Sequence, residues 1–249
     1  MQEDKMKENR YDDPVFFKKY AGMRRSREGL KGAGEWHVLK EMLPDLRGRR
    51  VLDLGCGYGW HCRYAAEQGA LSVMGIDISE KMLEKARQMS TDARITYRRM
   101  AMEDVSFPEE SYDVVISSLA LHYVEELQPL FVRIFHMLAS GGQLVFSCEH
   151  PLFTAYGDQD WVRDAQGNIL HFPLDHYFME GRREALFLGE RVIKYHHTLT
   201  AYLHGLSEAG FTLRDVREPA PTPQMVAAIE GMRDELRRPM MLIVAAEKR

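Results

Sequence analysis

Residues 51–59, VLDLGCGYG, decide the fold of this chain of 249 residues. An apolar run that contains one acidic residue, Asp53, leads into three glycines within five positions. This pattern predicts a buried strand that ends in a loop whose backbone comes close to a ligand. The alternative is a glycine-rich turn between a strand and a helix that binds nothing, and a single G-x-G would not exclude it.

The spacing of the glycines indicates which ligand the loop binds. A dinucleotide-binding loop has the pattern G-x-G-x-x-G, with the pyrophosphate at the N-terminus of the following helix. Here the third glycine comes one residue early, and Trp60 fills its expected place. The carboxylate of Asp53 would repel a pyrophosphate but suits a ligand with cationic groups. S-adenosylmethionine carries an ammonium and a sulfonium and no phosphate, so the pattern favours it over NAD or ATP.

The composition sets the class of protein and its partners. With 45% hydrophobic and 28% charged residues, the chain is typical of a globular protein, and its net charge of −4 argues against a nucleic-acid partner. The first ten residues are too charged for a secretory signal, and no apolar run approaches the roughly 20 residues that span a bilayer. Three cysteines without C-x-x-C spacing indicate reduced thiols rather than a disulfide framework or a metal site. We therefore expect a cytoplasmic protein with no membrane or nucleic-acid partner and no metal.

Strand and helix patterns alternate after residue 50, which predicts an α/β fold with a parallel sheet and helices on both faces. The expected strands cover residues 51–54, 71–76, 95–98, 112–116, 143–147, 211–217 and 240–246. The expected helices cover residues 60–68, 79–89, 124–138 and 198–209. Residues 48–148 form the predicted cofactor-binding core, and residues 196–249 are expected to complete the sheet of a single domain.

Two further segments depart from this alternation. Residues 1–47 are predicted to form an N-terminal helical lid segment, with a solvated tail over residues 1–9 and helices over 11–20 and 34–43. Residues 149–195 are rich in aromatic, histidine, glycine and charged residues, and they lack clean helical periodicity. We interpret them as an inserted substrate cap, with a β-ribbon whose arms lie near 161–170 and 186–195.

Two motifs after the glycine loop carry further chemistry. Asp77 ends the second predicted strand, 18 residues after Gly59, where an acidic side chain accepts hydrogen bonds from the ribose hydroxyls of an adenosine ligand. Met102 and Glu103 follow the third strand, at the sheet edge where such folds bind ligands. The thioether of Met102 suits the face of an adenine ring, although Glu103 could equally belong to a solvated loop.

Three stretches together, VLDLGCGYG, GIDIS and AMEDVSFPEESYDVVISSLALHYV, resemble the class I S-adenosylmethionine-dependent methyltransferase family of the small-molecule type. The resemblance is close over about residues 48–147. It implies a Rossmann-like, doubly wound, seven-stranded and mostly parallel sheet, with helices on both faces and an antiparallel last strand over residues 240–246, beside the fifth. One departure is Ala101, because many relatives carry an acidic residue near this position.

The resemblance also implies a set of residues that contact the cofactor. Three glycines line the methionine half, Asp53 lies near its ammonium, Asp77 binds the ribose, and Met102 and Glu103 lie beside the adenine. Neighbours within the same motifs complete the set. The predicted cofactor-binding residues are Asp53, Gly55, Gly57, Tyr58, Gly59, Asp77, Ile78, Met102, Glu103 and Leu119.

The implied reaction is in-line methyl transfer to a small-molecule acceptor. A base is needed only if the acceptor must lose a proton, and histidine is the natural candidate near neutral pH. Of the 10 histidines, His122 and His197 are the best candidates for a catalytic role. A protein that binds S-adenosylmethionine for regulation without catalysis is the alternative function, and an NAD-dependent oxidoreductase is a third that Trp60 argues against.

The aromatic residues of the insertion allow two interpretations. They could form an apolar cap over a small organic acceptor, or the surface of a homodimer. These residues are Tyr156, Trp161, Phe172, Tyr177, Phe178 and Phe187.

Overall fold

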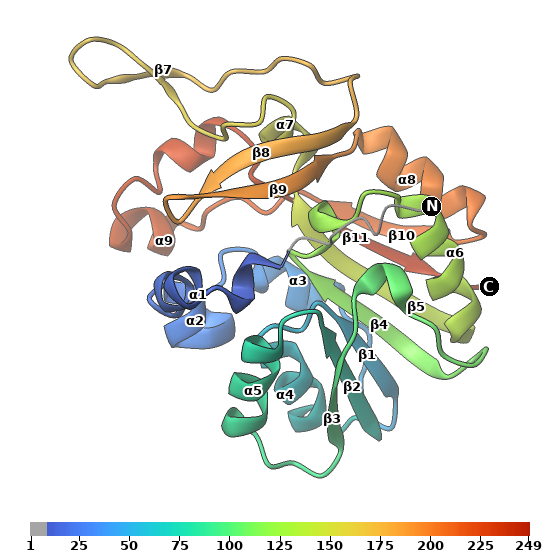
Figure 1. Cartoon of the computed structure of the whole chain (residues 1–249). Coiled ribbons are helices and arrows are strands. Elements are labelled where there is room, and N and C mark those ends of the chain that lie inside the picture. The colour runs from blue at the N-terminus through green and yellow to red at the C-terminus, as the bar shows by residue number, and fades with distance from the viewer. Residues whose placement is uncertain (1–8) are drawn as a thin grey trace, which may run out of the picture.

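A seven-stranded sheet forms the centre of the computed structural model, which describes residues 9–249 (Figure 1). The strand order is β10-β11-β5-β4-β1-β2-β3. The strands are β1 (Arg50–Leu54), β2 (Ser72–Asp77), β3 (Ile95–Arg99), β4 (Tyr112–Ser118), β5 (Leu138–Glu149), β10 (Thr212–Arg217) and β11 (Met241–Glu247). Strands β1 to β5 pair in parallel, whereas β11 is antiparallel to both β5 and β10. The predicted fold, including the antiparallel last strand beside the fifth, is confirmed.

Helices cover both faces of this sheet because successive strand residues point to opposite sides. Val51 packs with Cys62 in the core beneath α4 (Trp60–Glu67), whereas Leu52 packs with Phe131 in the core beneath α6 (Leu127–Met137). The first face also carries α3 (Trp36–Met42) and α5 (Glu80–Met89), and the second face carries α8 (Leu199–Glu208). Burial on both sides explains the nearly continuous apolar sequence of β4.

The N-terminal segment crosses the carboxyl ends of the strands as two short helices, α1 (Pro14–Ala21) and α2 (Arg24–Glu28), followed by α3. Asp13 begins α1 by accepting hydrogen bonds of 2.9 Å from the amides of residues 15 and 16. Helix α2 was not expected from the sequence, because its five residues, RRSRE, have no apolar periodicity. Of the solvated tail expected over residues 1–9, all but Asn9 lies outside the described residues.

The expected β-ribbon of residues 149–195, the segment that we call the cap, is two separate hairpins. Strands β8 (Gly181–Phe187) and β9 (Glu190–His196) pair with each other, so the expected second arm is present. The expected first arm is wrong, since β6 (Val162–Arg163) pairs locally with β7 (Ile169–His171). Leu188 and Gly189 both have positive φ, at 56° and 75°, which is the two-residue turn geometry that joins adjacent antiparallel strands.

Three further short elements complete the cap side of the molecule: α7 (Pro151–Thr154), α9 (Pro223–Ala228) and a 3₁₀ turn over Asp234–Arg237. Arg238 follows that turn, and its guanidinium lies 4.5 Å from the ring centre of Phe153, 4.8 Å from Trp161 and 4.5 Å from Phe172. These cation–π contacts hold the β6–β7 hairpin against α7 and the C-terminal segment. Within residues 9–249, no helix is long and apolar enough to cross a membrane.

Candidate active site

A cavity of about 720 Å³ lies where the carboxyl ends of β1, β2, β4 and β5 meet the N-terminal segment and the cap. Its volume lies within the ~300–1,000 Å³ range of small-molecule sites. Its position is the crevice at the sheet edge where doubly wound folds bind ligands. Most of the predicted site residues line it: Gly55, Gly57, Asp77, Ile78, Met102, Glu103, Leu119 and His122.

The three glycines of the loop have the same left-handed backbone, with φ between 53° and 71°, but different surroundings. A Cβ on Gly57 would meet nothing within 4 Å, so this residue borders open space. A Cβ on Gly55 would lie 2.6 Å from the Cβ of Ala120, and one on Gly59 would lie 2.2 Å from the hydroxyl of Tyr97. Gly59 therefore serves helix packing and lies outside the cavity wall, whereas Gly57 leaves room for a ligand.

Asp77 joins the glycine loop to the start of α5. Its Oδ2 accepts a hydrogen bond of 2.8 Å from the amide of Gly57, and its Oδ1 accepts one of 2.9 Å from the amide of Ser79. Burial raises the pKa of Asp77 to about 6, although both amides act in the opposite direction. Each carboxylate oxygen keeps a second lone pair, so the side chain can still accept hydrogen bonds from a ribose.

Besides Gly59, two predicted cofactor residues, Asp53 and Tyr58, lie outside the wall of the main cavity. Asp53 is buried behind the loop, where it accepts a hydrogen bond of 3.2 Å from Cys62 Sγ, and burial raises its pKa to about 7. Tyr58 is also buried and borders a second cavity of about 50 Å³ beside the loop. Besides Asp77, Glu35 is a carboxylate that lines the main cavity, and it comes from the N-terminal segment.

Glu35 belongs to a cluster of polar side chains that the sequence did not predict. It is 1% exposed, and its Oε1 accepts hydrogen bonds from Arg25 at 3.3 Å and from the Ser118 hydroxyl at 3.1 Å. All three side chains line the main cavity, and Arg25 and Ser118 also border the smaller one together with Gly55 and Gly57. The only sequence signal was a pair of ordinary charged residues before the first strand.

The third and fourth strands each contribute to the wall as they end. Met102 and Glu103 lie in a 3₁₀ turn over Met102–Asp104, and they line the cavity together with Ile78 from the end of β2. Leu119 follows β4 with a φ of 51°, a left-handed conformation that is rare for a branched side chain. Such strain is concentrated at functional sites, and Leu119 lines the cavity directly after Ser118.

The two candidate catalytic histidines have different positions. His122 lines the cavity, its Nδ1 accepts a hydrogen bond of 3.4 Å from the amide of Glu149, and burial lowers its pKa to about 4. The ring is therefore neutral, and this bond assigns its proton to Nε2. His197 lies outside the cavity wall, where Nε2 donates a hydrogen bond of 2.8 Å to the carbonyl of Val124, and its ring packs on Tyr202. The geometry gives His197 a structural role.

A second polar group lies on the cap side of the cavity. Lys194 on β9 donates hydrogen bonds of 2.5 Å to Glu149 Oε1 and 2.9 Å to Gln159 Oε1. Gln159 in turn donates one of 2.6 Å to Glu149 Oε2, and all three side chains line the cavity. The sequence signal for Glu149 was an acidic residue directly after a buried strand, whereas nothing in the local pattern singled out Lys194.

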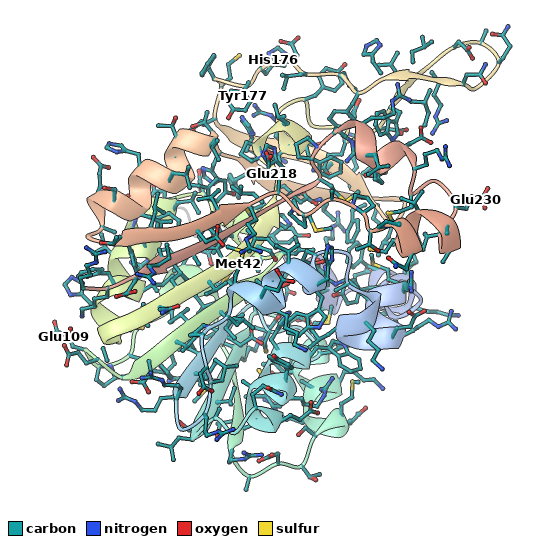
Figure 2. All side chains as sticks on the ribbon, turned by 180° about the vertical axis from the view of Figure 1, so that it is seen from behind. Met42, Glu109, His176, Tyr177, Glu218 and Glu230 are labelled. Atoms are coloured by element: carbon teal, nitrogen blue, oxygen red, sulfur yellow. The ribbon has the colours of Figure 1, made fainter. Side chains whose placement is uncertain are left out.

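Of the six aromatic residues of the cap for which an acceptor cap or a dimer surface was considered, Phe187 lines the cavity and the other five lie outside its wall. Phe153 of α7 also lines the cavity. Phe178 is 90% exposed. Figure 2 shows His176 and Tyr177 at the outer edge of the cap, far from the sheet on which Met42 packs. Among residues 9–249, no three histidine, cysteine, aspartate or glutamate side chains lie together as a metal site would need.

Known proteins resemble this chain in both sequence and structure. A family model described as a methyltransferase domain matches residues 52–146. A solved S-adenosylmethionine-dependent methyltransferase from Mesorhizobium loti is 44% identical, with a TM-score of 0.82 over 88% of this chain and 100% of that chain. A structure assigned to the same class from Listeria monocytogenes is 50% identical, with a TM-score of 0.81 over 87% of this chain and 98% of that chain. An uncharacterized protein of Haemophilus influenzae is 33% identical over 96% of both chains.

The fold, the glycine loop and these similarities define the class of protein. The chain belongs to the class I S-adenosylmethionine-dependent methyltransferase family. S-adenosylmethionine is the methyl donor of this family.

Proposed function

We propose that this methyltransferase transfers the methyl group to a small-molecule acceptor that binds in the same cavity, beneath the cap. The supporting observation is that one cavity extends from Gly57 and Asp77 at the cofactor loop to Glu149 and Lys194 at the cap. The cofactor half is formed by the sheet edge, and the cap half leaves space for a second molecule. The mostly apolar wall with a few polar groups is typical of a site for a small organic ligand.

The residues of the cofactor half fit an adenosyl ligand. Gly57 has the open space that a close approach of the ligand needs, and Asp77 keeps lone pairs for two ribose hydroxyls. Ile78 and Met102 supply apolar surface for the faces of an adenine ring, and Glu103 borders the same part of the cavity. We therefore assign these residues to the adenosine half of the cofactor.

We assign recognition of the methionine half to Arg25 and Glu35. An amino acid carries one carboxylate and one ammonium, and the two side chains offer the matching charges beside Gly55. Their mutual hydrogen bond of 3.3 Å is long for a charged pair, so both can turn toward a ligand. Glu35 Oε2 has no hydrogen-bond partner among residues 9–249, which leaves an acceptor for the ammonium. This assignment takes the role that the sequence suggested for Asp53.

The protein's contribution to the reaction is mainly positioning. The sulfonium of the bound cofactor supplies the methyl group and leaves as a neutral thioether, so no residue has to protonate a leaving group. Holding the acceptor in line and close can account for ~7–11 kcal/mol of the barrier. Leu119 and His122 both line the cavity, and we assign the meeting of acceptor and methyl group to their neighbourhood. The Nε2–H of His122 is a donor for an acceptor atom.

The test of this function compares two ligands by calorimetry. S-adenosylhomocysteine carries the amino-acid half, whereas 5′-methylthioadenosine lacks it. Arg25→Met and Glu35→Gln should each weaken S-adenosylhomocysteine binding about tenfold, the value of one charge-assisted hydrogen bond, and leave binding of 5′-methylthioadenosine unchanged. An equal loss for both ligands would contradict the assignment.

Turnover is tested with methyl-labelled S-adenosylmethionine and a cell extract divided by molecular mass. We expect label in the fraction of small molecules. Label only in protein or nucleic acid would contradict a small-molecule acceptor. Cofactor binding without any transfer is the result that a regulatory protein would give.

A further inference from the structure

The cap half of the cavity contains a buried pair of opposite charges. Lys194 is 2% exposed, and its ammonium lies 2.5 Å from Glu149 Oε1. Gln159 completes a triangle of hydrogen bonds with both partners. Gln159 also has a φ of 58°, a strained backbone conformation of the kind found at functional sites. A buried ion pair adds little to stability, so its presence in a cavity wall indicates a ligand site.

The surroundings of this pair are aromatic and apolar. Phe187 lies beneath the ammonium of Lys194, with its ring centre 5.2 Å from Nζ. Phe153, Met240 and Met241 line the same cavity. A ligand here would bury an apolar body against these side chains and present one polar group to the charged pair.

We infer that Glu149 and Lys194 bind the acidic hydroxyl of a small apolar acceptor, a phenol or an enol, with Glu149 as the base and Lys194 as the group that stabilises the oxyanion. This inference rests on the proposed function, since it names the acceptor for the same cavity. It concerns two residues that the sequence did not mark as catalytic.

The opposite charges of Glu149 and Lys194 favour a hydroxyl as the polar group of the acceptor. The pair carries one positive and one negative charge, so an acceptor carboxylate would meet the repulsion of Glu149, and an ammonium would meet that of Lys194. A hydroxyl is both a donor and an acceptor, so its proton can bond Glu149 while its oxygen accepts from Lys194. His122, which also faces this region, is neutral and adds a donor rather than a charge.

Because Glu149 is a weak base, the acceptor hydroxyl must be an acidic one. Burial alone would raise the pKa of Glu149, but the charge of Lys194 and the hydrogen bonds from Lys194 and Gln159 lower it below its usual value. A carboxylate with a low pKa is a weak base, and it cannot remove the proton of an ordinary alcohol. A phenol or an enol is acidic enough, since its pKa falls further beside the ammonium of Lys194.

Methylation of the acceptor hydroxyl consists of one proton transfer and one displacement at the methyl carbon. The hydroxyl proton passes to Glu149, and the oxygen forms a bond to the methyl carbon while the carbon–sulfur bond of the sulfonium breaks. The sulfur keeps the electron pair and becomes a neutral thioether. Glu149 then releases the proton to solvent as the methyl ether leaves, and Lys194 contributes hydrogen bonds without transferring a proton.

The experiment uses 4-nitrophenol, whose phenolate is coloured and whose neutral form is not. The full chain is first saturated with S-adenosylhomocysteine, and the probe is then titrated at a pH below its own pKa. The related compounds 4-nitroanisole, 4-nitrobenzoate and 4-nitrobenzylamine present an ether, a carboxylate and an ammonium on the same ring. We expect 4-nitrophenol to bind about tenfold or more tightly than each of the three, because only it makes both charge-assisted hydrogen bonds.

Three variants test the roles of the two charges. Glu149→Gln leaves Lys194 unopposed, so the coloured fraction of the bound probe should rise above that of the wild type. Lys194→Met should lower it below the wild type. Lys85→Met removes an exposed lysine from α5 and should leave the colour unchanged. If the pair only attached β9 to β5, Lys194→Met would lower the melting temperature. The coloured fraction of the bound probe would then not be highest in Glu149→Gln and lowest in Lys194→Met.

Two results would overturn the inference in a protein that binds S-adenosylhomocysteine normally. One is tighter binding of the ether, the acid or the amine, or binding of none of the four compounds. The other is an equal coloured fraction in the wild type, Glu149→Gln and Lys194→Met, each shown by circular dichroism to be folded. Failure of S-adenosylhomocysteine to bind at all would instead count against the proposed function.

Discussion

The amide of Gly57 donates a hydrogen bond of 2.8 Å to Asp77, which joins the loop after β1 to the end of β2. The two residues, both of which we assign to the adenosine half of the cofactor site, therefore also hold each other in place. Since Asp77 accepts a second amide bond from Ser79, its carboxylate shapes the site before any ligand arrives. We therefore expect cofactor binding and the shape of the loop to depend on the same side chain.

Asp77→Ala should weaken binding of both S-adenosylhomocysteine and 5′-methylthioadenosine about 100-fold or more. The substitution removes two charge-assisted hydrogen bonds to the ribose, each with a value of ~1.5–3 kcal/mol. Calorimetry at fixed pH measures both affinities. Asp92→Ala, which removes a half-exposed carboxylate that pairs with the nearby Arg94 before β3, is the control and should bind normally. A loss confined to S-adenosylhomocysteine would show that Asp77 does not contact the ribose.

Substitutions at three glycines should separate ligand contact from folding. Gly57→Ala should fold with a loss of ~1–2 kcal/mol, the cost of a left-handed conformation for alanine, but bind S-adenosylhomocysteine poorly because its Cβ enters the ligand space. Gly48→Ala has the same backbone cost, with φ of 71° and nothing near its Cβ, and should bind normally. Gly59→Ala should be the least stable, because its Cβ would lie 2.2 Å from the Tyr97 hydroxyl.

Chemical denaturation gives the stability of the three glycine variants, and calorimetry gives their affinities. The assignment of Gly57 would be wrong if Gly57→Ala and Gly48→Ala bound the ligand equally well.

The buried carboxylate of Asp53 should make stability depend on pH in a defined direction. Burial raises its pKa to about 7 in the folded state, well above the value of an unfolded chain. The folded state therefore binds this proton more tightly, and the contribution is lost as pH rises through 7. Asp53→Asn carries no such charge, so relative to the wild type it should gain about 2 kcal/mol between pH 5.5 and pH 8.

The difference between Asp53→Asn and the wild type is the quantity to measure, because buried histidines act in the opposite direction. Burial lowers the pKa of His61 and of His122 to about 4, so both favour unfolding as pH falls. These histidines are present in both proteins, and their effect cancels. A difference in the free energy of unfolding that stays constant with pH would contradict the burial of a charged Asp53.

The sheet could be predicted from the sequence because its signal is local. A strand buried on both faces must be apolar throughout, and the glycine loop and Asp77 each sit at a strand end that the pattern marks. The helices and strands of the core were therefore expected within a few residues of their bounds. The antiparallel last strand followed from the family resemblance rather than from its own residues.

The acceptor half could not be predicted, because its residues meet only through tertiary packing. Glu149 and Lys194 are 45 residues apart, and their contact depends on how the β8–β9 hairpin folds over β5. The role of Arg25 and Glu35 could not be predicted either, because a short helix such as α2 has no apolar periodicity that would place its side chains. His197 shows the converse: it lies in a segment that the sequence favoured, but its Nε2 donates a hydrogen bond to the carbonyl of Val124.

The N-terminal segment should control release of the cofactor through Asp12. Its Oδ1 accepts hydrogen bonds of 2.6 Å from the Ser79 hydroxyl and 3.1 Å from the amide of Lys81, at the start of α5. The adjacent Tyr11 lines the cavity, and its hydroxyl lies 3.0 Å from that of Tyr123. Asp12 therefore attaches the N-terminal segment, which borders the cavity, to the start of α5.

Asp12→Ala should speed dissociation of S-adenosylhomocysteine about 30-fold, because two hydrogen bonds of ~1 kcal/mol each that hold the segment closed are lost. Stopped-flow displacement by an excess of 5′-methylthioadenosine measures the rate. Asp92→Ala again serves as the control. If Asp12→Ala released the ligand at the wild-type rate, residues 9–47 would be a fixed part of the wall rather than a lid.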